Sequence, residues 1–99
     1  MEPPEIASVA EGLAITQPVR GTRLLQALYE TNGRCISVTE DEIWRAYHTM
    51  AGKGFFIEPT SATAIAGLGK VLDQVEPDES IVIVLTGSGL KTTPKFSHF

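Results

Sequence analysis

The chain has 99 residues, of which 42% are hydrophobic and 20% are charged, and its formal net charge is −4. This length allows a single domain, and such a domain buries only about 60–65% of the surface that its unfolded chain exposes. An acidic chain without a run of like charge argues against nucleic acid as a partner. No apolar run approaches the ~18 residues of a membrane span, so we expect no membrane partner. The single cysteine, Cys35, excludes an internal disulfide and fits a reducing compartment, and we therefore expect a cytoplasmic location.

The first third of the chain predicts a candidate short strand at residues 13–15, then one helix and a second short strand. Residues 1–9 carry adjacent prolines and, with the polar tail at 92–99, are expected to be flexible. Thr22 can cap a helix, and Asn32 can end it in a left-handed conformation. The apolar stripe of this helix consists of Leu24, Leu25 and Leu28. Residues 35–38 then favour a short strand, with Cys35 as a small core residue.

A capping box marks the start of a second helix. Thr39 can accept a hydrogen bond from the first turn, and Glu42 follows three residues later. Capping and the helix dipole explain all the carboxylates of residues 40–42, so we predict no metal site there. The residues with helical spacing on its inner face are Ile43, Ala46, Tyr47, Met50 and Ala51.

A third helix follows the sequence Glu-Pro-Thr-Ser-Ala at residues 58–62. Thr60 or Ser61 can cap it. Its inner face is predicted to carry mostly small residues, namely Ala62, Ile65, Ala66, Gly69 and Leu72. We therefore expect a neighbouring element to pack very closely against this helix.

Residues 81–85, with the sequence Ile-Val-Ile-Val-Leu, have the composition of a strand buried on both faces. Thr86 ends this run, and Gly-Ser-Gly follows at residues 87–89. In open α/β sheets, ligands bind beyond the carboxyl ends of strands. Residues 86–89 are therefore the best candidate for a small-molecule site; the alternative is an ordinary strand exit that binds nothing.

These elements predict an α/β fold that is only part of a three-layer architecture. A few parallel strands would form an incomplete sheet, flanked by about three helices. If residues 35–38 and 81–85 share a sheet, the crossover between them makes them parallel. Too few strands are present to cover an apolar strand on both sides. We therefore expect self-association, or completion of the sheet by an N-terminal partner fragment or a larger domain.

Two motifs in this order and at this separation resemble a known family. Residues 58–62 and residues 86–91 (Thr-Gly-Ser-Gly-Leu-Lys) are similar to the carboxyl-terminal part of the threonine synthase family. That family belongs to the tryptophan synthase β-like (fold type II) group of pyridoxal-phosphate enzymes. The resemblance covers roughly residues 10–91 and includes further similar segments at residues 13–18, 38–43 and 66–68. The sequence departs from the family at Ser88, where histidine is frequent, and at Thr92, where aspartate is frequent.

The resemblance implies pyridoxal 5'-phosphate as the cofactor of the complete enzyme. Thr86 matches the hydroxyl residue that hydrogen-bonds the pyridine nitrogen, and Gly87 keeps the approach to the ring free of side chains. Glu58 matches a glutamate close to the cofactor pocket; its alternative role is that of a buried structural carboxylate. Lys91 matches a structural lysine, which is not the Schiff-base lysine.

The family's Schiff-base lysine, its asparagine beside the cofactor oxygen and its Gly-rich phosphate cup lie upstream of the segment that this chain resembles. We therefore expect a carboxyl-terminal fragment that has no catalytic residue of its own, is inactive alone and binds the cofactor weakly or not at all. The parent reaction implied by the resemblance converts the amino-acid substrate O-phosphohomoserine, with water, to threonine and phosphate.

Two alternatives remain open on the sequence. The chain could derive from another member of the group, such as cysteate synthase or threonine dehydratase. It could also be a non-enzymatic α/β module that binds a ligand or completes the sheet of a partner.

Overall fold

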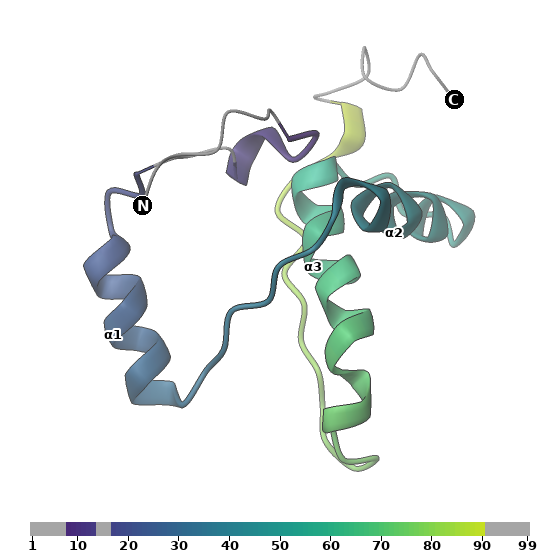
Figure 1. Ribbon diagram of the computed structural model, residues 1–99. Helices are drawn as coiled ribbons and strands as arrows, with labels where there is room; N and C mark the ends of the chain where they lie inside the picture. The colour runs from purple at the N-terminus through teal and green to yellow at the C-terminus, as the bar shows by residue number, and fades with distance from the viewer. Residues whose placement is uncertain (1–7, 14–16, 91–99) are drawn as a thin grey trace.

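The computed structural model of the chain describes residues 8–13 and 17–90, and these residues form helices and connecting segments (Figure 1). In chain order the elements are η1 (Glu11–Leu13), α1 (Gly21–Thr31), α2 (Glu40–Gly52), α3 (Pro59–Val71) and η2 (Leu72–Gln74). Most of the segments at 1–9 and 92–99 lie outside the described residues. Residues 8 and 9 are described, and both are held by the Glu40 carboxylate. Its oxygens accept from Ser8 Oγ over 2.5 Å and from the Val9 amide over 2.9 Å.

The core lies where α2 crosses the upper part of α3 (Figure 1). Its buried hydrophobic residues come from the start of the chain, from α2, and from the beginning of α3 and the segment before it: Ala10, Ile43, Ala46, Tyr47, Ile57 and Ala62. Ala62 is completely buried, so its small side chain lets the neighbouring elements approach closely. The predicted close packing against α3 is confirmed at Ala62, whereas Gly69 and Leu72, at the far end of the predicted face, are exposed.

Local signals at the start of α2 act as predicted. The Thr39 hydroxyl accepts a hydrogen bond from the Glu42 amide over 3.2 Å, which satisfies one of the free donors of the first turn. A second set of contacts ties this end of α2 to α3. The Lys70 ammonium lies 2.9 Å from Glu42 Oε2 and donates to the Ser37 carbonyl oxygen over 2.8 Å.

The start of α3 differs from the prediction. The helix begins at Pro59, with Glu58 in the N-cap position and no side-chain cap. Proline suits the first helical position because its ring fixes φ and its missing N–H would have no helical partner there. Thr60 and Ser61 therefore lie inside the first turn, and the prediction that one of them caps the helix was wrong.

Helix α1 stands apart from the other two helices (Figure 1) and has no buried residue. It follows Arg20 without a side-chain cap, so the prediction of a Thr22 cap was wrong. Asn32 ends it with a φ of 55°, which confirms the predicted left-handed terminator. Its apolar stripe faces solvent, and Tyr29 is 86% exposed.

The predicted parallel strands are absent from the described part of the chain, which is mostly helical. Residues 81–85 run alongside α3 (Figure 1) without forming a strand, and Val82 and Val84 are 87% and 70% exposed. Residues 35–38 form no strand either, and Cys35 is exposed rather than part of the core. A strand requires a neighbour that shares its backbone hydrogen bonds. Within residues 8–13 and 17–90 the only β-pairing is an isolated antiparallel bridge between Ile57 and Ser88.

The helical part of the fold prediction is confirmed, because the described residues form three α-helices. Whether residues 35–38 and 81–85 are parallel stays a prediction, since they share no sheet. None of the helices in the described ranges has the length and apolar character that crossing a membrane requires.

Candidate functional site

The three predicted site residues, Glu58, Thr86 and Gly87, lie together where the segment at 86–89 meets the start of α3. They are brought together by backbone hydrogen bonds between residues 56–58 and residues 87–89. The Glu58 amide donates to the Gly87 carbonyl oxygen over 3.1 Å, and the Gly89 amide donates to the Phe56 carbonyl oxygen over 3.1 Å. These two hydrogen bonds flank the Ile57–Ser88 bridge. The two motifs that carry the resemblance are thus joined directly by the backbone.

Ser61 is the centre of the cluster. Its side chain is only 2% exposed. Its Oγ accepts a hydrogen bond from the Thr86 amide over 2.8 Å and one from the Gly87 amide over 3.2 Å. The same oxygen lies 2.9 Å from Thr86 Oγ1. One hydroxyl in the first turn of α3 therefore holds both the backbone and the side chain of the segment that follows.

Glu58 is the third member of the side-chain network. Thr86 Oγ1 donates to Glu58 Oε1 over 3.2 Å, so the Thr86 hydroxyl lies between a serine and a carboxylate. Glu58 is half-buried, whereas Thr86 is exposed. Two side chains therefore fix the hydroxyl of Thr86, which as a residue is exposed to solvent.

This arrangement fits one contact to a pyridoxal ring. A hydroxyl held in position on an exposed residue can hydrogen-bond a pyridine nitrogen, and the adjacent Gly87 places no side chain beside it. Within the described residues, no group of three or more His, Cys, Asp or Glu side chains gathers in a way that could hold a metal ion.

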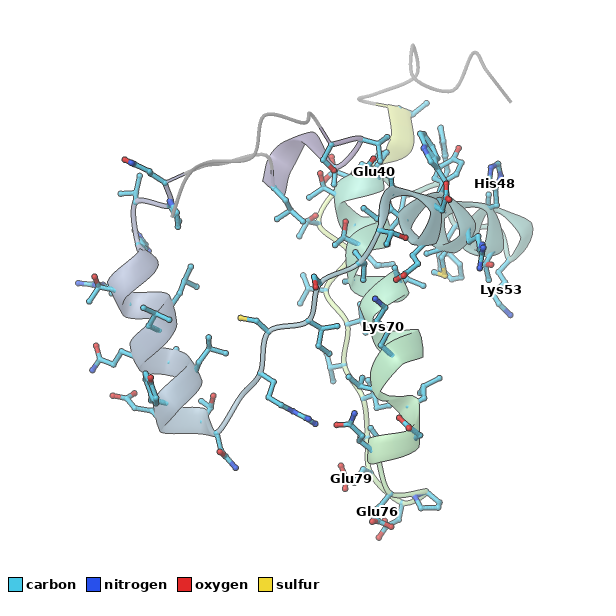
Figure 2. All side chains as sticks on the ribbon, in the orientation of Figure 1. Glu40, His48, Lys53, Lys70, Glu76 and Glu79 are labelled. Carbon is cyan, nitrogen blue, oxygen red and sulfur yellow. The ribbon has the colours of Figure 1, made fainter. Side chains whose placement is uncertain are left out.

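The lysines of the described residues lie on α3 and beyond the end of α2. Figure 2 shows Lys70 on α3 and Lys53 at the far end of α2. The Lys70 ammonium is engaged by Glu42 and by the Ser37 carbonyl oxygen. Lys91, which the resemblance assigns a structural role, lies outside the described residues.

Sequence reasoning missed the role of Ser61, which it considered only as a helix cap. A signal was nevertheless present. Ser61 lies four residues before Ile65 and beside Ala62, so helical spacing places this hydroxyl on the predicted inner face. A polar side chain at an inward position requires a hydrogen-bond partner. The identity of that partner, 25 residues away at Thr86, depends on the tertiary structure.

Comparison with known proteins extends over most of the chain. A family model described as "Pyridoxal-phosphate dependent enzyme" matches residues 2–87.

Curated relatives named threonine synthase match a similar range. The protein of Methanocaldococcus jannaschii is 41% identical over 87 residues, which cover 85% of this chain and 22% of the relative. The protein of Halalkalibacterium halodurans is 39% identical over 94 residues, which cover 92% of this chain and 26% of the relative. The protein of Mycobacterium leprae is 38% identical over 87 residues, which cover 85% of this chain and 24% of the relative. The chain therefore spans about a quarter of the length of these relatives.

Proposed function

The chain belongs to the family of pyridoxal-phosphate-dependent enzymes, and we propose that it supplies the pyridine-nitrogen side of the cofactor pocket in a threonine synthase-like enzyme. The reaction of the complete enzyme would convert O-phosphohomoserine and water to threonine and phosphate. The relatives' shared name and their 38–41% identity over most of this chain support the assignment.

The single observation that carries the proposal is the hydroxyl of Thr86, an exposed residue, which Ser61 and Glu58 hold by hydrogen bonds. A hydroxyl can hydrogen-bond a ring nitrogen, but it cannot keep that nitrogen protonated as a carboxylate can. The cofactor supplies an electron sink, and the protein tunes that sink through such contacts. A neutral contact gives a weaker sink, which suits elimination and replacement at the β-carbon.

The proposed role of Glu58 depends on the hydrogen bond that it accepts from the Thr86 hydroxyl. In the structure the hydroxyl proton points to Glu58 Oε1. To donate to an unprotonated ring nitrogen, the Thr86 hydroxyl would turn away from Glu58. The proposed role of Glu58 is therefore to hold the Thr86 hydroxyl near its working position without contacting the ring nitrogen itself.

The rest of the pocket would come from the part of the family fold that this chain does not span. We infer that a Schiff-base lysine and a phosphate-binding loop lie there. Strands from that part would also pair with residues 81–85, whose exposed Val82 and Val84 would then become buried. An N-terminal partner fragment, or a longer polypeptide, would provide both the rest of the pocket and the strands.

A chimeric enzyme tests the proposal. Residues 9–90 of this chain would replace the matching segment of the Methanocaldococcus jannaschii relative, and cofactor affinity and phosphate release from O-phosphohomoserine would be measured. Thr86→Val should weaken cofactor binding about threefold to tenfold, which corresponds to one neutral hydrogen bond. Thr86→Ser should retain the affinity.

The matched control is Thr49→Val, which makes the same change on the exposed side of α2. This variant should bind the cofactor as the unmodified chimera does. The proposal is wrong if Thr86→Val and Thr49→Val bind the cofactor equally well.

A further inference from the structure

The hydrogen bonds around Ser61 determine where its own proton points. A serine hydroxyl has one donor and two acceptor lone pairs. The backbone amides of Thr86 and Gly87 both donate to Ser61 Oγ, over 2.8 and 3.2 Å, and so occupy both lone pairs. The remaining contact, 2.9 Å to Thr86 Oγ1, must then carry the serine proton. Ser61 is therefore the donor, and Thr86 Oγ1 is the acceptor.

The Thr86 hydroxyl is consequently held from two directions. It accepts from Ser61 and donates to Glu58 Oε1 over 3.2 Å, so its proton and one of its lone pairs are both engaged. The side chain of an exposed threonine can otherwise occupy several staggered rotamers. The bond from the buried serine selects one of them, and the two amide bonds fix the backbone from which this side chain projects.

We propose that Ser61 is a positioning residue that fixes the direction of the Thr86 hydroxyl by donating its own proton to Thr86 Oγ1. It acts through Thr86 and does not itself touch a cofactor. The significance of this role for catalysis rests on the proposed function of Thr86. The role itself is a property of this chain, and it can be measured without a cofactor.

Nuclear magnetic resonance on the full 99-residue chain provides the test. Three-bond couplings from Thr86 Cγ2 to its backbone nitrogen and carbonyl carbon report whether the side chain occupies one rotamer. We expect one rotamer in the wild type and averaged couplings in Ser61→Ala. The amides of Thr86 and Gly87 should exchange with solvent about tenfold faster in that variant, whereas Ser61→Thr, which keeps the hydroxyl, should restore the wild-type couplings.

Two further variants separate positioning from general destabilisation. Thr63→Val removes another hydroxyl of α3, one that donates to the Pro59 carbonyl oxygen over 3.3 Å, and it should leave the Thr86 couplings unchanged. Thr86→Val removes the acceptor of the serine proton but keeps both amide donors. In this variant the backbone amides of residues 86 and 87 should stay protected from exchange with solvent. This second expectation does not depend on Ser61→Ala remaining folded.

Several outcomes would overturn the inference. Unchanged Thr86 couplings in Ser61→Ala would show that the serine does not select the rotamer. Unprotected Thr86 and Gly87 amides in the wild type would show that the cluster does not form. The proposed function fails independently, when Thr86→Val leaves cofactor binding by the chimera unchanged; the measured effect of Ser61 on the Thr86 rotamer would still stand in that case.

Discussion

The Gly89 amide donates a hydrogen bond to the Phe56 carbonyl oxygen over 3.1 Å, while the Phe56 ring occupies the space that a side chain at position 89 would need. A Cβ atom at position 89 would lie 2.3 Å from Cε1 of that ring. Both contacts lie where backbone pairing holds the 86–89 segment against the segment that leads into α3.

Gly89→Ala should therefore destabilise the fold by about 1–3 kcal/mol, the usual cost of overpacking. Denaturant unfolding followed by circular dichroism would measure it. The matched control is Gly67→Ala within α3, where a Cβ would meet no atom within 4 Å. That change should stabilise the helix by up to about 1 kcal/mol. Adding Phe56→Ala should reduce the penalty of Gly89→Ala, and equal penalties in both backgrounds would contradict the steric explanation.

The ion pair between Glu42 and Lys70 should make stability depend on pH. The hydrogen bond from the Lys70 ammonium holds the pKa of the Glu42 carboxyl below its ordinary value of 4.5. Because the pKa is lowered in the folded state, the contribution is fully present above the ordinary value and is lost as the pH falls through the lowered one. Stability should thus decline on acidification below about pH 4.5.

Unfolding measured across this pH range would test the assignment. Lys70→Met should remove the part of the acid sensitivity that Glu42 contributes. Lys53→Met deletes a positive charge beyond the end of α2, and this variant should keep the acid sensitivity that Glu42 contributes. If the two variants respond to acid in the same way, Lys70 is not the cause of the lowered pKa.

This chain alone should form no covalent adduct between a lysine and pyridoxal phosphate and should make no threonine. Such chemistry needs a lysine amine held at the cofactor's aldehyde, and the amine of Lys70 is engaged by Glu42. One neutral hydrogen bond from Thr86 contributes only about 0.5–1.5 kcal/mol, against the ~8 kcal/mol of micromolar affinity. After excess cofactor is removed, the absorption spectrum should show no retained band. A band that disappears when one lysine is mutated would contradict the prediction.

Exposed apolar side chains should make the isolated chain self-associate or be only marginally stable. Tyr29 on α1 and Val82 and Val84 in the segment at residues 81–85 are all at least 70% exposed. Sedimentation equilibrium should detect association, and Val82→Lys with Val84→Lys should weaken it because a buried charge is costly. Thr49→Lys on α2 is the control and should leave it unchanged. A monomer with a cooperative melt above about 65 °C would count against the prediction.

The sequence by itself determined the features that depend on near neighbours in the chain. The Thr39 cap and the left-handed Asn32 were predictable because both involve hydrogen bonds and backbone angles within one helical turn. The pattern of apolar residues also predicted which side of α2 is buried at Ile43, Ala46 and Tyr47. The Gly-rich segment after the apolar run at residues 81–85 predicted Thr86 and Gly87 as candidate site residues, whereas Glu58 was predicted by resemblance alone.

Only the tertiary structure decided what those residues contact. It placed Thr86 against Ser61, 25 residues away, and turned a candidate helix cap into the centre of the site. It also left residues 81–85 without a strand partner among the described residues, although their composition favours a strand. The physical reason is the same in both cases. A side chain's polarity and a segment's strand propensity are local properties, whereas the hydrogen bonds that realise them require a second segment at the right distance.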